Sequence, residues 1–263
     1  RVLPSVVPTL CCVTSARCPS GISRYADMTD KLMPLSYSRL STFETCPRKF
    51  EYLYVLKSVK DEGSTATDYG TRVHEALENY GRALVSGDPV AMEGVIALEG
   101  GEAGKWLPMV KKICSRPGQV LFEHQMAIKR DKTPCGWFDS DVWLRSIADV
   151  LIIDGKRAYC LDWKTGKKRE NPTQMQLFAA MVFLQFPEVE EVVTSFVWLI
   201  ADDMTNATYQ RRYADSLWLS FEPRLVQVQE SVDLGVFAAK PSGLCPWCPA
   251  QDICGDAKRG KRK

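Results

Sequence analysis

The sequence predicts an α/β protein in which helices flank a mixed central β-sheet. Three observations support this fold class: a strand–turn–strand unit in mid-chain, an amphipathic helix before it, and a helix followed by a strand after it. Helices and strands that alternate in this way favour a sheet with helices packed on its faces. In chain order, these elements span residues 69–85, 142–153, 158–163, 173–186 and 191–200.

The composition is that of an ordinary globular protein. Hydrophobic residues make up 45% and charged residues 25% of the 263 positions. The formal net charge is only +2, so any binding of nucleic acid must depend on local patches. No apolar run approaches the ~20 residues that a transmembrane helix needs. We therefore expect no membrane contact and a location in the cytoplasm.

The two ends of the chain differ from its middle. Residues 1–32 have no clear hydrophobic period and are interrupted by prolines, so we expect a disordered or non-native extension. A signal peptide is the rival interpretation of this segment. Residues 257–263 form a basic tail that either contacts nucleic acid or only solubilises the chain. The domain itself is expected to span residues 33–256.

The central strand–turn–strand unit carries two carboxylates and an ammonium. Its turn is predicted at Asp154-Gly155, a strong hairpin signal. Asp162 and Lys164 share one face of their strand, because side chains alternate with period 2. A two-residue loop would place Asp149 diagonal to Asp162, a four-residue loop would place them directly opposite, and a three-residue loop would separate them. In either favourable register the acids lie roughly 5–8 Å apart at Cβ.

A divalent cation is a suitable partner for these acids. Asp149 is in phase with the apolar Ile147 and Leu151, and an unpaired buried charge costs several kcal/mol. Two carboxylates, water and a substrate phosphate are a usual way to hold Mg²⁺, which polarises the phosphoryl oxygen. A nearby lysine such as Lys164 can orient the water and stabilise the developing charge. The alternative is a surface hairpin with a salt bridge.

Two predicted helices each carry one polar residue beside an apolar face. His74 lies at the edge of the stripe on the first helix, where a lone histidine is more often structural than a ligand. Gln174 begins the apolar face of the helix after the hairpin, so its amide needs a buried partner. Glu123, on a strand predicted at 120–129, is interpreted as structural, with a water-mediated metal contact as the minor alternative.

A short basic connector follows the hairpin. It contains Lys167, Lys168 and Arg169 and ends before a proline. Such a stretch is usually a solvated loop. Its position beside the predicted metal site also makes it a candidate contact for DNA phosphates.

The chain contains ten cysteines, which is a high number. Cys245, Cys248 and Cys254 form a Cys-x-x-Cys-x5-Cys pattern, which puts two thiolates on one tight turn. A chain of this length is not a small disulfide scaffold, so metal binding is the better interpretation. Three clustered thiolates need a fourth, and Cys46 is the candidate; a buried free thiol is its alternative. Redox disulfides rank below a metal site.

Taken together, these motifs resemble the PD-(D/E)XK nuclease superfamily, specifically its RecB/AddB-like branch with a four-cysteine iron–sulfur cluster. CRISPR-adaptation exonucleases are also similar. The resemblance covers about residues 35–256. Its motifs, in chain order, are Cys46, Gly70-x-x-x-His74, Asp149, Asp162-Trp163-Lys164-Thr165-Gly166, Gln174-x-x-x-Phe178 and Cys245-x-x-Cys248-x5-Cys254.

Three positions depart from the family pattern. Ser146 stands where the family usually has glycine, and Trp163 replaces tyrosine, but neither change removes a metal ligand. Phe178 also replaces a tyrosine. Because its ring lacks the hydroxyl, only the role of the preceding glutamine carries over.

The resemblance implies a role for each matching residue. His74, Asp149 and Asp162 would bind Mg²⁺ or Mn²⁺, Lys164 would position the attacking water, and Gln174 would support the site. The four motif cysteines would hold a [4Fe–4S] cluster. A tetrahedral zinc site is the runner-up for them. Either metal would join the two ends of the domain and so be structural rather than catalytic.

The function implied is that of a Mg²⁺- or Mn²⁺-dependent DNA exonuclease in recombination, repair, or phage- or CRISPR-related processing. Its substrate would be single-stranded DNA or a duplex with an end. The sequence has no Gly-x-x-x-x-Gly-Lys-[Ser/Thr] motif, so a helicase, or a recombination or CRISPR protein, would be a partner and not part of this chain. The alternative is a noncatalytic DNA-binding or scaffold module stabilised by an iron–sulfur or zinc site.

Overall fold

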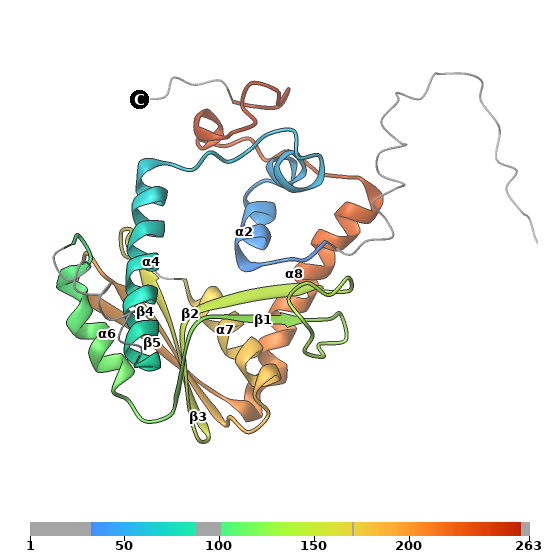
Figure 1. Ribbon diagram of the computed structural model, residues 1–263. Helices are drawn as coiled ribbons and strands as arrows, with labels where there is room; N and C mark the ends of the chain where they lie inside the picture. Colours follow the sequence, from blue (N-terminus) through green and yellow to red (C-terminus); the bar gives the residue numbers. More distant parts are fainter. Residues whose placement is uncertain (1–32, 88–100, 170, 259–263) are drawn as a thin grey trace, which may run out of the picture.

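The computed structural model describes residues 33–87, 101–169 and 171–258, so the predictions for residues 1–32 and for most of the basic tail lie outside the described residues. Its centre is a five-stranded sheet in the order β1-β2-β3-β4-β5 (Figure 1). Among these neighbours, β3 and β4 are parallel and the other pairs are antiparallel. The strands are β1 Gln119–Ile128, β2 Leu144–Asp154, β3 Arg157–Lys164, β4 Glu191–Trp198 and β5 Asp203–Gln210. The predicted mixed sheet is confirmed.

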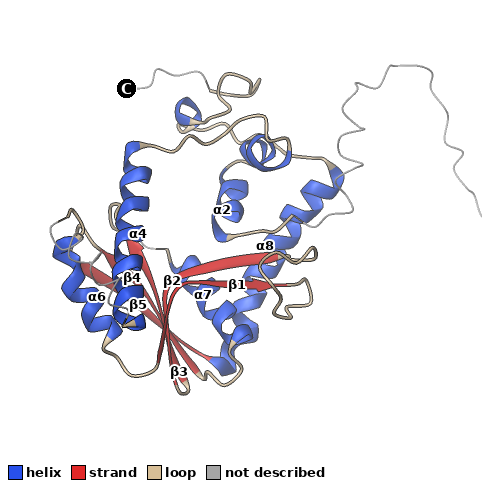
Figure 2. Ribbon diagram, viewed as in Figure 1, coloured by secondary structure: helices blue, strands red, loops and turns tan. Residues whose placement is uncertain are grey.

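Helices cover both faces of this sheet (Figure 2). The main ones are α2 Tyr37–Thr45, α3 Pro47–Phe50, α4 Thr65–Ser86, α6 Leu107–Cys114, α7 Pro172–Gln185 and α8 Ala214–Leu234. Helices α4 and α6 pack with Val150 and Leu161 in one core, whereas α7 and α8 pack with Leu151 and Cys160 in another. Adjacent strand residues therefore serve opposite cores, as a period of 2 requires. The predicted α/β class is confirmed.

Helix α7 makes the connection between the two parallel strands. Parallel neighbours need a crossover, and α7 lies between β3 and β4 in the chain. Eight of its 14 residues are buried, because it packs between the sheet and α8. Among the described residues, no helix is both long and apolar enough to cross a membrane.

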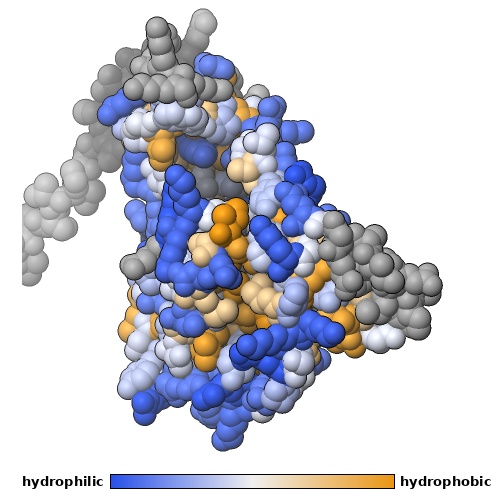
Figure 3. All heavy atoms as spheres, turned by 90° about the vertical axis from the view of Figure 1, so that its left-hand side faces the viewer, coloured by the Kyte–Doolittle hydropathy of each residue, from blue (hydrophilic) through white to orange (hydrophobic). Residues whose placement is uncertain are grey.

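Helix α4 lies unusually close to β1. A Cβ added at Gly81 would stand 2.0 Å from the ring carbon Cζ of Phe122, so only glycine allows this approach. The Arg82 side chain donates from Nη2 to the Phe122 carbonyl at 2.7 Å. On the face that carries α4 and α6, mostly hydrophilic side chains surround a smaller group of hydrophobic ones (Figure 3).

The N-terminal helices and the C-terminal segment lie together (Figure 1). Helix α2 packs on α8, and Arg224 Nε forms an ion pair with Glu44 Oε1 at 2.6 Å. The chain then returns to α3, where Cys46 and Cys245, the first residue of the short turn Cys245–Trp247, border the same cavity. Two segments almost the whole chain apart are thus brought side by side.

Candidate active site

The register of the central hairpin places Asp149 opposite Asp162. Asp154 pairs with Arg157 and Val150 pairs with Leu161, and this register continues to the two acids. It is the one predicted for a four-residue loop, although the closing pair leaves only two residues in the turn. No further β2–β3 pair follows Val150 and Leu161 toward the acids. The end of the hairpin is therefore open at the carboxylates.

Asp149 occupies the space between the two strands. Its Oδ2 accepts a hydrogen bond of 2.6 Å from the backbone N–H of Trp163. The same oxygen lies 3.3 Å from Nδ1 of His74 on α4. The Asp149 side chain is only 11% exposed, so these two partners help to stabilise a carboxylate in a nearly dry position.

Helix α4 packs on one face of the sheet and presents His74 to this site. Gly70 and His74 are four residues apart and share one face of α4. A Cβ at Gly70 would stand 2.9 Å from Oγ1 of Thr165, just after β3, so α4 approaches the end of β3 closely. Burial lowers the pKa of His74, but its hydrogen bond to Asp149 and the charges of nearby acids outweigh burial and raise it.

Glu123, which the sequence predicts as structural with a water-mediated metal contact as the minor alternative, lies in one group with His74 and Asp149. It stands opposite Asp149 on β1, and its φ of +47° interrupts the pairing between Phe122–Val150 and His124–Ala148. Donor atoms of His74, Glu123 and Asp149 all lie within 4.8 Å of one another. The sequence placed Glu123 on a strand but did not predict its direct position in this group, because a left-handed backbone at a glutamate cannot be read from residue type.

The chemistry of this donor set suits a divalent cation. Carboxylates and an imidazole are ligands that Mg²⁺ or Mn²⁺ accepts. Burial, and then the charge of Asp149, raise the pKa of Glu123 to about 7. The carboxylates thus repel one another, and a bound cation would relieve that repulsion. The group opens into a cavity of about 740 Å³ that also reaches Thr165.

Asp162 belongs to a second network beside this group. Its Oδ2 lies 2.5 Å from Nζ of Lys164, and its Oδ1 accepts from Nε2 of Gln174 at 3.3 Å. Lys164 Nζ also donates to Oε1 of Gln174 at 3.3 Å and stands 4.7 Å from the ring centre of Phe196. Burial, and then the charge of Asp149, raise the pKa of Asp162 to about 6, against the lowering effect of Lys164.

The predicted ligand set His74, Asp149 and Asp162 is therefore arranged in two parts. Within the described part of the chain, the group with donors closer than 4.8 Å contains Glu123 in place of Asp162. Asp162 Oδ2 forms an ion pair of 2.5 Å with Lys164 Nζ, and a carboxylate oxygen has a second lone pair that can face a cation. Such an oxygen is available to a cation held by the neighbouring group.

Gln174 is held in place from two directions. Asn171 caps α7 by accepting a hydrogen bond of 3.3 Å from the Gln174 backbone N–H. Tyr37 at the start of α2 donates its hydroxyl to the same Asn171 oxygen at 2.7 Å. A tyrosine from another helix thus supports the start of α7, whereas Phe178 brings no hydroxyl to it.

The basic connector lies on the surface beyond β3. Lys167, Lys168 and Arg169 are all exposed. Lys168 forms an ion pair with Asp203 at 2.5 Å, so its charge is partly neutralised. None of the three contacts the carboxylate group in the structure as described.

The four predicted cluster cysteines border one small cavity of about 30 Å³. Cys46 Sγ accepts from the Lys240 backbone N–H at 3.5 Å, and Cys245 Sγ accepts from the Ser242 N–H at 3.3 Å. Backbone N–H groups lower the pKa of Cys245, whereas burial raises that of Cys248. In the described chain, no three of these sulfurs lie within 4.8 Å of one another.

An α/β core that gathers carboxylates, an imidazole and a lysine at the open end of a hairpin can bind a divalent cation beside that lysine. The chain belongs to the PD-(D/E)XK nuclease superfamily, whose family model matches residues 34–255. Nucleases of this superfamily use divalent metal ions. The superfamily-level part of the predicted resemblance is confirmed, and the RecB/AddB-like branch stays a prediction.

Two solved structures are similar to this chain over most of its length. The crystal structure of SSO0001 has 12% identity and a TM-score of 0.38, covering 90% of this chain and 94% of that chain. The crystal structure of "Putative exonuclease" from Eubacterium rectale has 12% identity and a TM-score of 0.43, covering 94% and 97%. No curated protein matches the chain.

Proposed function

We propose that this nuclease is a Mg²⁺- or Mn²⁺-dependent DNA exonuclease of the RecB/AddB-like branch. The observation that carries the proposal is the position of the His74–Glu123–Asp149 donor group directly beside the Asp162–Lys164 pair. The donor group can bind a cation, and the Asp162–Lys164 pair can position the attacking water. Such a pairing is what metal-assisted hydrolysis of a phosphodiester requires.

Each side chain has a role that follows from its contacts. His74, Asp149 and Asp162 would hold the ion, together with Glu123, and when bound it would supply a charge that polarises the phosphoryl oxygen and lowers the pKa of a water. Lys164, fixed by Asp162 and Gln174, orients that water and offsets charge on the phosphoryl group. Since Gln174 binds both partners, it is a positioning residue.

We also propose that the four cysteines hold a [4Fe–4S] cluster. Two sulfurs bound to one zinc ion at about 2.3 Å can be at most about 4.6 Å apart. The four cysteines share a cavity, yet no three of their sulfurs are within 4.8 Å. Four thiolates from one chain suit a [4Fe–4S] cluster, and a tetrahedral zinc site is the alternative.

The remaining proposals concern the setting of the activity. Residues 33–256 act as one nuclease domain in the cytoplasm, on single-stranded DNA or on the ends of duplexes. Lys167, Lys168 and Arg169 supply phosphate contacts next to the site. A helicase, or a recombination or CRISPR protein, delivers DNA during recombination, repair or phage- or CRISPR-related processing.

A cleavage assay tests the catalytic proposal. Protein purified without oxygen is incubated with end-labelled single-stranded, duplex and circular DNA, in Mg²⁺, Mn²⁺ or EDTA. We expect metal-dependent cleavage of DNA with ends, and a loss of at least ~100-fold in Lys164→Ala. Lys156→Ala, in the turn at the far end of the hairpin, is the control and should cleave as the wild type does.

The outcomes separate the hypotheses. Cleavage of circular DNA, which has no ends, would show that the protein is an endonuclease and contradict the proposed exonuclease. Equal activity of Lys164→Ala and the wild type would refute the assigned site. Binding of DNA without cleavage in either metal would favour a noncatalytic DNA-binding or scaffold module.

A further inference from the structure

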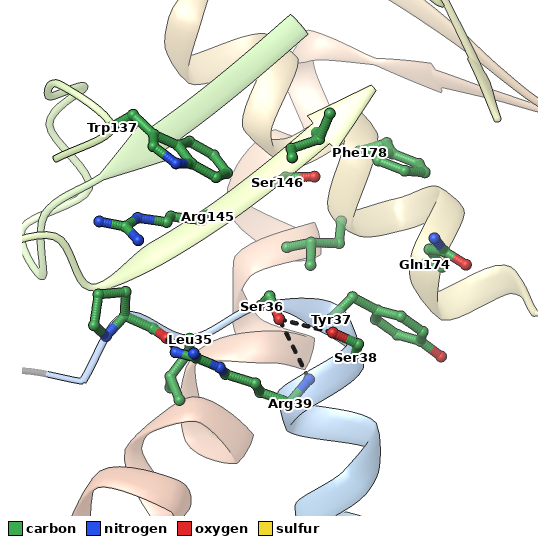
Figure 4. A pocket seen from close by; sticks show the side chains of 13 residues that line it. Leu35, Ser36, Tyr37, Ser38, Arg39, Trp137, Arg145, Ser146, Gln174 and Phe178 are labelled. Atoms are coloured by element: carbon green, nitrogen blue, oxygen red, sulfur yellow. Dashed lines mark hydrogen bonds between the residues drawn. The ribbon is translucent and has the colours of Figure 1, made fainter. Parts of the chain in front are cut away.

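A second cavity adjoins the candidate active site. It has a volume of about 390 Å³, within the range of small-molecule sites, and lies between the start of α2, β2 and α7 (Figure 4). Gln174 forms part of its wall and at the same time contacts Lys164 and Asp162. Ile147 lines both this cavity and the one at His74. A single side chain, that of Gln174, therefore separates this cavity from Asp162 and Lys164.

Two guanidinium groups lie at the end of this cavity away from Gln174 (Figure 4). Neither Arg39 nor Arg145 forms an ion pair with an acid in the described part of the chain. Burial lowers the pKa of Arg39 against the raising effect of Tyr54, and the nearby charge of Arg145 adds to the lowering. Arg145 Nε is buried and has no hydrogen-bond partner among the residues that the structure describes. Two neighbouring cations without a counter-charge are the electrostatic signature of an anion site.

The wall beside these arginines is aromatic and apolar. The Arg145 guanidinium carbon lies 5.0 Å from the ring centre of Trp137, which is half-buried on the loop between β1 and β2. Phe138, the next residue of that loop, is 87% exposed. Leu177 and Phe178 from α7 line the cavity further along. Such surfaces bind the faces of unpaired bases.

We propose that this cavity binds one nucleotide of a single DNA strand next to the scissile phosphate. Its phosphate lies between Arg39 and Arg145, and its base packs on the wall that includes Trp137. A base in this position is unstacked and unpaired, so the cavity selects single-stranded DNA. This inference deepens the proposed nuclease function and rests on it.

A binding assay tests the cavity separately from cleavage. All variants are made in the Lys164→Ala background and kept in EDTA, so that no DNA is cut. The dissociation constants of a fluorescein-labelled single-stranded oligonucleotide and of the matching duplex are measured by anisotropy over a range of salt concentrations.

The two parts of the cavity should respond differently. Arg145→Gln should weaken single-strand binding about 10-fold and reduce the slope of log K against log salt by about 0.7, because one phosphate contact is lost. Trp137→Ala should weaken binding about 5- to 50-fold with the slope unchanged, and Trp137→Phe should restore most of it. Duplex binding should change less in every case.

Arg116→Gln is the matched control. Arg116 lies 4.8 Å from the ring centre of Tyr159, so it repeats the arginine–aromatic pair at a different cavity and removes the same charge. Thermal unfolding checks that each variant is folded, and Arg39→Gln replaces Arg145→Gln if the latter is not. If Arg145→Gln and Arg39→Gln bind like the control, the inference is wrong.

The cavity and the catalytic proposal can fail independently. If the wild type cleaves DNA and depends on Lys164, while the cavity variants bind normally, only the cavity assignment is refuted. If no cleavage occurs but single-strand binding depends on Arg145 and Trp137, the cavity stands and the catalytic proposal fails. Equal losses with Trp137→Ala and Trp137→Phe would refute the contact with the base.

Discussion

Glu123 has a backbone conformation that few residues of its type adopt. Its φ of +47° lies in the left-handed region, which costs about 1–3 kcal/mol for a residue with a Cβ. Such strain persists only where the surrounding structure over-determines it, and it concentrates at functional sites. Here it accompanies a glutamate that stands with His74 and Asp149. The strained backbone brings a third donor to the group, and binding of a cation by that donor can offset the cost of the strain.

Metal binding should depend on Glu123 and on pH. Burial and Asp149 hold the pKa of Glu123 at about 7, so the carboxylate is protonated below that pH and proton release must accompany binding. Affinity for Mn²⁺ should therefore rise with pH up to about 7. Glu123→Gln should lower this affinity at least ~10-fold and flatten its pH dependence, as measured by calorimetric titration.

Glu75→Gln is the matched control for that titration. Glu75 lines the same cavity but lies outside the donor group. Its substitution should leave both the affinity and the pH dependence unchanged. Equal behaviour of the two variants would show that Glu123 does not bind the ion.

At the scale of elements, the sequence predicts the helices and strands that build the hydrophobic core, but it does not predict the polar edge strand. The helix that became α7 was predicted because its apolar residues form a long run. β5 (Asp203–Gln210) was not predicted, because it is an edge strand whose side chains are mostly polar and partly exposed. A strand stabilised by one neighbour leaves little hydrophobic pattern in the sequence.

The hairpin register shows the same limit. The period of 2 brings Asp149 and Asp162 together on one face for a loop of two or four residues and separates them for a loop of three. It does not decide which loop length occurs. The turn was expected at Asp154-Gly155, whereas the structure pairs Asp154 with Arg157 and turns at Gly155-Lys156. Gly155 has a φ of +54°, which suits the first loop position that a type II′ turn reserves for glycine. Turn type, and not hydrophobicity, decided the register.

Packing of α4 on β1 should be sensitive to a single methyl group. In a helix interior, Gly→Ala normally stabilises by about 1 kcal/mol. Gly81→Ala should instead destabilise the protein by about 1–3 kcal/mol, because its Cβ would stand 2.0 Å from the Phe122 ring. Since Phe122 adjoins Glu123 and α4 carries His74, Mn²⁺ affinity should fall as well.

A double variant provides the control for this effect. Phe122→Leu shortens the side chain that the added methyl group would meet, so Gly81→Ala should cost less in that background. Denaturant unfolding of both single variants and of the double variant gives their coupling energy. Additive effects, or a stabilised Gly81→Ala protein, would contradict the proposed close approach.

At the scale of the molecule, aromatic packing and two polar contacts join the C-terminal segment, residues 235–258, to α2 and α3. Lys240 Nζ donates to the Glu44 carbonyl at 3.0 Å, and its backbone N–H reaches Cys46 Sγ at 3.5 Å. Both contacts are exposed, and exposed contacts of this kind contribute little. Phe237 stacks on Phe50 with ring centres 6.2 Å apart, and the cavity bordered by Cys46, Cys245, Cys248 and Cys254 is a further connection. A metal cluster there would close a loop of roughly 200 residues.

Loss of that cluster should loosen the ends while the sheet stays folded. Closing so long a loop contributes about 4–5 kcal/mol on a disulfide scale, or about 10 °C in melting temperature for a domain of this size. Cys248→Ser should lose iron, sulfide and visible absorption, lower the melting temperature by about that amount, and increase hydrogen exchange in α2, α3 and residues 240–258 more than in β2 and β3. Cys135→Ser, away from the cavity, should do none of this. If the wild type contains zinc and no sulfide, the site binds zinc instead of an iron–sulfur cluster but still joins the two ends of the domain. If metal content and stability are unchanged in Cys248→Ser, neither the metal site nor its stabilising role is correct.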